Sequence, residues 1–148
     1  LTLIIGSNLF SQIDYMEVRD QFTISCGKTD STELVQNQKL LDSISQFEII
    51  NGEEQFLCDL GMTYYKVYLK WKKEEDNLKS TEANQKCWDK YQNTRALWNL
   101  GANYGISQNC NKKLELTELY VKHMKENDLE ELISYKQVYY RYKFCRDN

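Results

Sequence analysis

The chain has 148 residues, of which 41% are hydrophobic and 13% aromatic, so it has the length of one domain and enough apolar residues for a core. This composition excludes an intrinsically disordered chain. The formal net charge of −3 argues against nucleic acid as the main partner, because nucleic-acid-binding proteins usually carry a basic face.

The first seven residues resemble the end of a signal peptide, with an apolar run followed by the small residues Gly6 and Ser7. A buried strand or the start of a helix is the alternative interpretation. We predict that residues 1–7 are a signal-peptide remnant, that residues 8–148 form a single helical domain, and that the protein is secreted. No later apolar run approaches the roughly 20 residues that span a bilayer, so we expect no stable membrane insertion.

The segment that follows is predicted to be mixed, with a short helix within residues 14–27. Asp30 and Glu33 have the spacing of a capping box, which predicts that a helix begins there. Asn51-Gly52 indicates a turn, although this pair alone would also suit a β-hairpin. The predicted helix between them carries apolar residues at helical spacing, namely Leu34, Leu41, Ile44 and Phe47.

The clearest predicted helix comes next, and the charged run Lys70–Lys79 is interpreted as its solvated end and a loop. A fourth helix is expected to begin near Ser80 and to end at the glycine-containing stretch Gly101–Gly105. The complete absence of proline is consistent with long helices joined by polar turns. The apolar stripes of these two helices are Leu57, Leu60, Tyr64, Val67, Tyr68 and Trp71, then Ala83, Cys87, Tyr91 and Trp98.

The last third of the chain is predicted to contain a segment that begins at Cys110 and a final helix. Asn127 or Asp128 can cap this final helix, with Glu130 or Glu131 completing the capping box. The predicted fold is therefore all-α, with five to six amphipathic helices linked by disulfides. The apolar positions are Leu114, Leu116, Leu119, Tyr120 and Met124, followed by Leu132, Ile133, Tyr139, Tyr142 and Cys145.

Five well-separated cysteines agree with secretion, because small exported domains usually use such residues for disulfides. No CxxC motif occurs and the chain has one histidine, so we expect neither a metal site nor a cofactor. An odd number leaves at least one thiol over, and many pairings are compatible with the spacing. We favour two bridges, Cys26–Cys58 and Cys87–Cys110, with Cys145 left unpaired or linked to another chain.

Catalytic motifs are missing from the sequence, which has no GxSxG, Walker, GxGxxG or HExxH pattern. The single histidine, His123, is interpreted as a surface or packing residue. A nucleophilic pair would need His123 and a free cysteine such as Cys145, and no third member of a triad is near either in the sequence. We therefore predict that the protein is not an enzyme.

The aromatic residues are the remaining distinctive feature. They can be explained as core and amphipathic surface, or as the walls of an internal pocket, because tyrosine and tryptophan combine an apolar ring with one polar group. The candidate ligand-binding residues are Tyr64, Tyr68, Trp71, Tyr91, Trp98, Tyr139 and Tyr142.

The cysteine intervals Cys26-x31-Cys58 and Cys87-x22-Cys110, and the stretch Phe47–Glu54 before Cys58, resemble the odorant-binding superfamily. The chain is especially similar to the short salivary ligand-binding proteins of blood-feeding flies, and the resemblance covers about residues 26–110. It implies an all-helical pocket that sequesters small hydrophobic or amine ligands without catalysis. The family's further cysteine near Cys58 or Cys87 is absent here.

Two functions follow from these observations. The first is a secreted protein that sequesters a small hydrophobic, lipid-like or aromatic ligand in an internal helical pocket. The alternative is an extracellular protein–protein interaction domain, such as an effector, a cytokine-like bundle or a receptor accessory subunit, that uses exposed tyrosine-rich helix faces. An exposed patch of Tyr135, Tyr140 and Trp88 would favour the alternative.

Overall fold

The computed structural model describes residues 12–22 and 30–147, so the predicted signal remnant lies outside the described residues. The predicted all-α class is confirmed, with seven α-helices in the described part of the chain instead of five or six. The elements are β1 (Gln12–Asp14), α1 (Tyr15–Phe22), α2 (Ser31–Ile44), β2 (Glu48–Asn51), α3 (Glu53–Trp71), α4 (Glu74–Tyr91), α5 (Thr94–Ile106), α6 (Cys110–Glu126), the 3-10 turn η1 (Glu130–Leu132) and α7 (Tyr135–Asp147).

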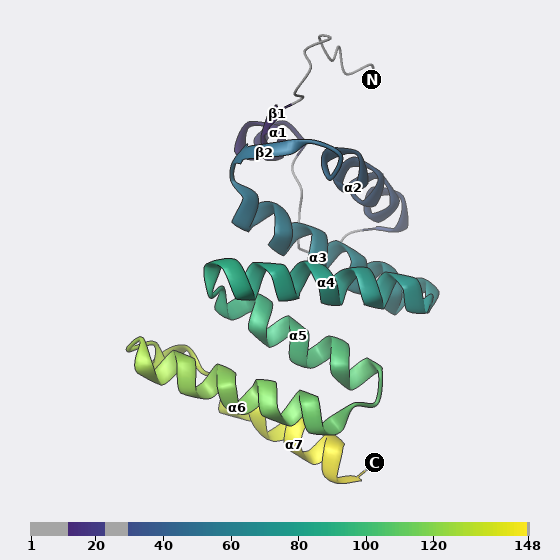
Figure 1. The fold of residues 1–148 in the computed structure, drawn as a ribbon. Helices are drawn as coiled ribbons and strands as arrows, with labels where there is room; N and C mark the ends of the chain where they lie inside the picture. The colour runs from purple at the N-terminus through teal and green to yellow at the C-terminus, as the bar shows by residue number, and fades with distance from the viewer. Residues whose placement is uncertain (1–11, 23–29, 148) are drawn as a thin grey trace.

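The helices from α3 to α7 form a stack in which each helix packs mainly on the next one in the chain (Figure 1). The N-terminal helices and strands lie at one end of the stack, and α7 lies at the other. Two buried clusters form the core, and the half-buried Trp88 packs against both of them. They consist of Tyr15, Leu41, Ile44, Phe56, Leu57, Cys58, Cys87 and Ala96, and of Leu97, Leu100 and Leu116.

The N-terminal end of the stack contains one confirmed helix start and one strand pair that was not predicted. The Asp30 carboxylate accepts hydrogen bonds from the backbone N–H groups of Thr32 and Glu33, at 2.7 and 2.9 Å, so α2 begins as predicted. Asn51 ends β2, which pairs in parallel with β1 instead of forming a hairpin. Gly52 has a φ of 78°, a left-handed conformation that glycine adopts easily, and α3 begins immediately after it.

The charged run Lys70–Lys79 was wrongly predicted as a loop. Only residues 72 and 73 separate α3 from α4, because Lys72 adopts a left-handed conformation that ends α3 and Glu74 starts α4. Three acidic residues, Glu74, Glu75 and Asp76, occupy the first turn of α4, where the helix dipole favours negative charge. The charges therefore mark a helix start.

The predicted fourth helix is in fact two helices, and the glycine-containing stretch does not break it. The break falls at Gln92 and Asn93, where the Asn93 side chain accepts a hydrogen bond from the Ala96 N–H at 3.0 Å and caps α5. Gly101 and Gly105 lie inside α5. A Cβ at Gly105 would lie 2.9 Å from the Lys113 Nζ, and one at Gly101 would collide with the Arg141 guanidinium. These glycines permit close packing of α6 and α7 on α5.

We expect Gly101→Ala to destabilise the protein by about 1–2 kcal/mol, because the new methyl group displaces the buried Arg141 side chain. In an Arg141→Ala background the same change should stabilise the protein by about 0.5–1 kcal/mol, because alanine has the better helix propensity. Urea unfolding of the four proteins in this double-mutant cycle measures both effects. Stabilisation by Gly101→Ala in both backgrounds would contradict the proposed close packing.

Candidate functional site

The seven aromatic residues that were predicted to line one pocket are distributed over several parts of the structure. Tyr64 is buried in the α2–α3–α4 region, where it donates a hydrogen bond to Asp42 and accepts one from Lys79. Burial and the Asp42 carboxylate raise the pKa of Tyr64. The Tyr91 hydroxyl donates to Glu53 at 2.7 Å, which joins α4 to the start of α3.

The other predicted aromatic residues do not converge on Tyr64. Tyr68 is half-buried on α3, and Trp71 is exposed at its C-terminal end. Trp98 is half-buried on α5 and packs against Tyr120 at a ring distance of 4.8 Å. Tyr139 and Tyr142 are exposed on α7, so the structure does not bring the seven residues together at one place.

The most distinctive surface in the described part of the chain is α7, because its aromatic residues face solvent. Tyr135, Tyr139 and Tyr140 have exposed fractions of 51%, 57% and 54%, and Tyr142 and Phe144 are exposed as well. The patch of Tyr135, Tyr140 and Trp88 is present only in part, because Trp88 packs in the core and forms an edge-on contact with His123. We call the exposed residues Tyr135, Tyr139, Tyr140, Tyr142 and Phe144 the α7 aromatic face.

Arg141 fixes the inner side of α7 to α5. It is the one buried residue of α7, with an exposed fraction of 8%, and its guanidinium lies 3.3 Å from the ring centre of Trp98. Its Nη2 donates to the Trp98 carbonyl oxygen at 2.7 Å. Burial lowers the pKa of Arg141 to about 10, and burial together with Arg141 lowers the pKa of the neighbouring Lys113. The inner side of α7 therefore packs on α5 through the charged Arg141 side chain, where the sequence predicts an apolar contact.

A disulfide between Cys110 and Cys145 joins the start of α6 to the end of α7, with the two Cα atoms 5.4 Å apart. The predicted pair Cys87–Cys110 and the predicted leftover Cys145 are therefore wrong. Antiparallel packing of α6 and α7 explains the pairing, because it places the first residue of one helix beside the last turn of the other. Cys87 lies instead beside Cys58, whose predicted partner Cys26 lies outside the described residues.

Two adjoining grooves run between α6 and α7, and Tyr142 lines both of them. One has a volume of about 440 Å³ and includes Val121 and Val138, and the other has about 280 Å³ and includes Leu114. Together they form a shallow surface that includes apolar residues, which we call the α6/α7 groove. Its remaining lining residues are Glu118, Lys122, Lys125, Glu126, Tyr135, Tyr139, Lys143, Cys145 and Arg146.

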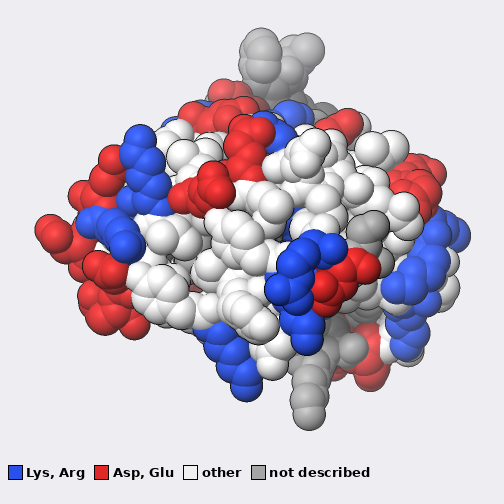
Figure 2. Space-filling view, turned by 90° about the horizontal axis from the view of Figure 1, so that it is seen from below, with Lys and Arg blue, Asp and Glu red and all other residues white. Residues whose placement is uncertain are grey.

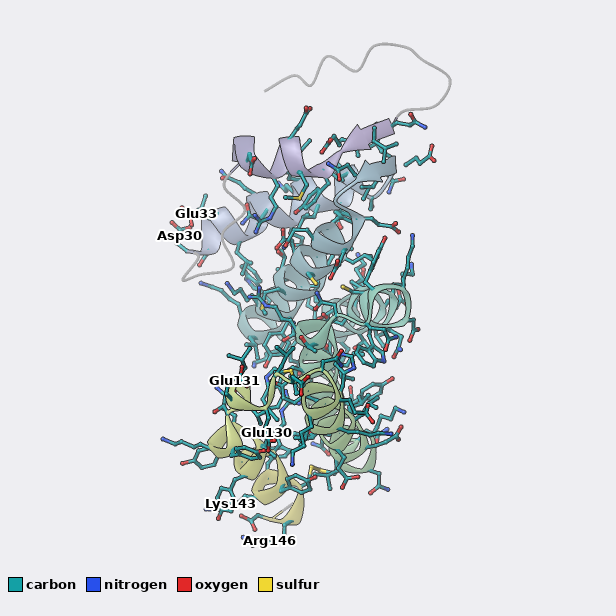
Figure 3. The ribbon with its side chains drawn as sticks, turned by 90° about the vertical axis from the view of Figure 1, so that its left-hand side faces the viewer. Asp30, Glu33, Glu130, Glu131, Lys143 and Arg146 are labelled. Atoms are coloured by element: carbon teal, nitrogen blue, oxygen red, sulfur yellow. A yellow bond between two sulfur atoms is a disulfide. The ribbon has the colours of Figure 1, made fainter. Side chains whose placement is uncertain are left out.

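Basic side chains accompany the aromatic residues on α7. The helix contains four basic residues and one acidic residue, in a chain whose net charge is −3. Figure 2 views the molecule from the α7 end and shows uncharged surface in the middle, with charged side chains around it. Figure 3 places Lys143 and Arg146 toward the end of α7, away from Glu130 and Glu131. Among the described residues, Lys143 forms no ion pair.

A second concave surface lies between α2, α3 and α4. This cleft has a volume of about 460 Å³, and Phe56, Leu57, Leu60, Tyr64 and Ala83 provide its apolar lining. Ser45 and Gln46 also line it, and charged residues from α2 and α4 complete it. These residues are Asp42, Lys79, Glu82 and Lys86.

Other site types were searched for within residues 12–22 and 30–147. No group of three or more potential metal ligands occurs there. In the same part of the chain, no helix combines the length and the apolar character that a membrane span requires.

The final helix starts at Tyr135 and not near Asn127, because residues 130–132 form a 3-10 turn, so Glu130 and Glu131 do not close a capping box.

Comparison with known proteins identifies no relative. No protein-family model matches the chain, and no match was found among the curated proteins or the solved structures. The resemblance to the odorant-binding superfamily therefore stays a prediction, and any function must be argued from the residues themselves.

Proposed function

We propose that this chain is a secreted interaction domain whose α7 aromatic face and α6/α7 groove bind an acidic partner protein. The observation that carries the proposal is the group of five exposed aromatic side chains on one short helix. Exposed aromatic residues are costly to hydrate, and tyrosine is enriched among the residues that dominate binding energy at protein interfaces. The Cys110–Cys145 disulfide supports the secreted location, because such bonds persist in oxidising compartments.

Charge complementarity supports an acidic partner. Lys136, Lys143 and Arg146 are exposed on the same helix as the aromatic face, whereas Asp147 is its one acidic residue. A partner with Asp or Glu around an apolar centre would match this arrangement, with the charges mainly raising the association rate and the aromatic rings providing affinity. Screening by salt should therefore weaken binding.

Peptide selection tests this proposal with a defined probe. The immobilised chain is presented with two displayed peptide libraries, one combining Asp and Glu with Leu, Phe and Trp, the other combining Lys and Arg with the same apolar residues. We expect enrichment from the acidic library. Tyr139→Ala should then weaken a selected peptide about 30-fold, since an interface hot spot contributes about 2 kcal/mol.

The matched control is Tyr68→Ala, which removes a tyrosine from α3, and it should leave the dissociation constant unchanged. Lys143→Glu should weaken binding and reduce its dependence on salt. Equal enrichment from the two libraries, or equal binding to the Tyr139→Ala protein, would contradict the proposal.

A second candidate function is the sequestration of a small hydrophobic ligand, and the α2–α3–α4 cleft favours it. Its volume of about 460 Å³ lies within the usual range for ligand sites, and its lining combines apolar side chains with Tyr64 and Lys79. A lipid-like molecule with an anionic head would place its chain against Leu60 and its charge near the lysines. Of the seven predicted aromatic residues, Tyr64 is the one that lines this cleft.

Titration with a fluorescent fatty acid tests this second function. Saturable binding to the full chain is expected, and Leu60→Trp should abolish it by filling the cleft. Leu78→Trp is the matched control, because Leu78 is exposed on α4 and is not part of the cleft lining. Non-saturable binding, or equal binding to the Leu60→Trp protein, would exclude this function for the cleft.

A further inference from the structure

Two cysteines meet at the interface between α3 and α4. The Sγ atoms of Cys58 and Cys87 are 3.1 Å apart, closer than non-bonded sulfur atoms normally approach, and about 1 Å longer than the roughly 2.05 Å of a disulfide bond. Cys58 has an exposed fraction of 8% and Cys87 of 0%, and both belong to the larger core cluster. Water therefore has little access to either sulfur.

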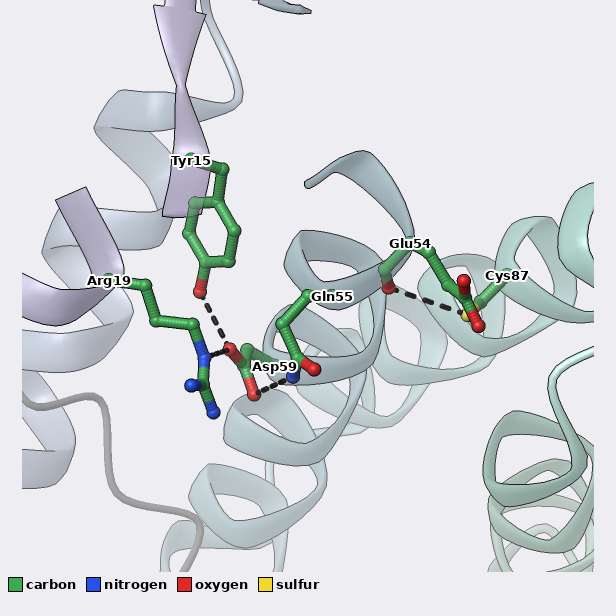
Figure 4. A network of polar contacts seen from close by, with 6 residues as sticks. All are labelled: Tyr15, Arg19, Glu54, Gln55, Asp59 and Cys87. Atoms are coloured by element: carbon green, nitrogen blue, oxygen red, sulfur yellow. Dashed lines mark hydrogen bonds and ion pairs between the residues drawn. The ribbon is translucent and has the colours of Figure 1, made fainter. Parts of the chain in front are cut away.

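The surroundings of the pair hold both side chains toward each other. The two helices α3 and α4 form the most extensive helix–helix contact in the described structure. The second contact of the Cys87 thiol is with the main-chain oxygen of Glu54, at 3.6 Å, on the turn that precedes Cys58 (Figure 4). The two sulfurs need to approach by only about 1 Å more to reach bonding distance.

From this geometry we propose that Cys58 and Cys87 form a second disulfide, which links α3 to α4. The oxidant is a disulfide-bearing thiol carrier, such as oxidised glutathione or a disulfide-exchange enzyme of the secretory compartment. The Cys58 thiolate attacks one sulfur of the donor and releases the first thiol. The Cys87 thiolate then attacks the Cys58 sulfur in the mixed disulfide and releases the second thiol. The donor accepts two electrons, and the protons of the two cysteines end on its thiols.

The order of these two attacks follows from the surroundings of each sulfur. Cys58 is the more exposed of the two, and its contact with the Cys87 thiol lowers its pKa, whereas that same contact and burial raise the pKa of Cys87. Cys58 is therefore the first nucleophile. Because both sulfurs are buried in the folded chain, exchange takes place during folding or during local opening of the α3–α4 contact.

The bond would give each end of the stack its own covalent link. Cys58–Cys87 would join the two helices beside the larger core cluster, and Cys110–Cys145 joins the last two helices. Disulfides in such small domains compensate for a limited core. This pairing also changes the prediction for Cys26, which would be the cysteine left over.

Peptide mapping of the full chain, expressed through an oxidising secretory route, tests the proposal. The protein is denatured without reductant, alkylated with iodoacetamide, digested and analysed by mass spectrometry. We expect a linked pair of peptides containing Cys58 and Cys87, two hydrogens lighter than the two thiol forms. Alkylation of both cysteines without prior reduction would overturn the proposal, and so would a link between Cys58 and Cys26.

Two variants make the result specific. Cys26→Ser is the matched control and should leave the Cys58–Cys87 link intact. Loss of this link in the Cys26→Ser protein would overturn the proposal. A Cys26→Ser/Cys110→Ser/Cys145→Ser protein retains only this pair of cysteines, and oxidised glutathione should remove two thiols from it under refolding conditions. Reduction of this refolded protein should lower its thermal midpoint by several degrees. An unchanged thiol count would contradict the proposed bond, and this result is independent of whether α7 binds a partner.

Discussion

Replacing Cys145 with serine is expected to lower the free energy of unfolding by about 3–4 kcal/mol and to release the end of α7. The bridge to Cys110 has a sequence separation of 35 residues, and a disulfide that encloses a segment of this length restricts the unfolded chain by about that amount. The remaining attachment of α7 depends largely on Arg141, which is its one buried residue. Loss of the bond should therefore affect this helix more than the others.

Urea unfolding and hydrogen exchange measure the two effects. Cys110→Ser, Cys145→Ser and the double variant should have the same stability, because each removes the same bond. Amides of α7 should exchange faster in all three, while those of α3 and α4 keep their protection. A double variant that loses twice as much stability as either single variant would show that the two residues act separately.

Asp59→Ala is expected to cost about 3–5 kcal/mol, the usual cost of removing one partner from a buried charged network. The Asp59 carboxylate is almost fully buried on α3 and accepts at least three hydrogen bonds from described residues (Figure 4). The donors are the Tyr15 hydroxyl at 2.8 Å, the Arg19 Nε at 2.7 Å and the Gln55 amide at 2.9 Å. The substitution would leave the buried Tyr15 hydroxyl without this acceptor and weaken the attachment of α1 to α3.

Asp59→Asn keeps the shape of the side chain and should cost less than Asp59→Ala. Asp89→Ala is the matched control, because Asp89 is exposed and accepts one hydrogen bond from Gln85, so a change within about 0.5 kcal/mol is expected. Chemical denaturation gives the free energies of unfolding of the three variants. Hydrogen exchange of the α1 amides measures how firmly α1 is held against α3. A cost below about 1 kcal/mol for Asp59→Ala would contradict a structural role for this network.

Local sequence patterns predicted the start of α2 correctly, together with the three residues that this helix buries. Asp30 has the polar side chain and the position that a helix cap requires, and the predicted apolar residues Leu34, Leu41 and Ile44 of α2 are buried. The break between α4 and α5 could also have been found, since Asn93 precedes Thr94 in a pattern that suits a cap. The apolar spacing from Ala83 to Trp98 continues across this break and so indicates one helix instead of two.

Contacts between distant residues explain most of the remaining errors. Gly101 and Gly105 suggest a break when only their neighbours in the sequence are considered, but their role depends on Arg141 and Lys113, which lie on other helices. The polar stripe Asn77, Ser80 and Asn84 likewise suggests a solvated face. These three side chains are buried, and each forms a hydrogen bond with the Asn103 side chain of α5. Asn77 also donates a hydrogen bond to Ser107. A polar side chain in the sequence therefore did not indicate an exposed position.

The candidate site was predictable in composition but not in position. Tyr139 and Tyr142 are among the candidate ligand-binding residues of the sequence analysis, and both line the α6/α7 groove. Their exposure depends on which side of α7 packs inward, and that side contains the polar Arg141 together with Val138 and Cys145. The cysteine pairing followed from the antiparallel arrangement of α6 and α7, which no spacing rule contains.

The order in which the helices are stacked has a consequence for how the chain folds. From α3 to α7, neighbours in space are neighbours in sequence, so most of the tertiary contacts have low contact order. Such topologies fold quickly, because little chain entropy is lost before each contact forms. The parallel pairing of β1 with β2 across α1 and α2 is the main exception. Oxidation of Cys110 and Cys145 needs only the docking of α6 and α7, and so does not depend on this slower step.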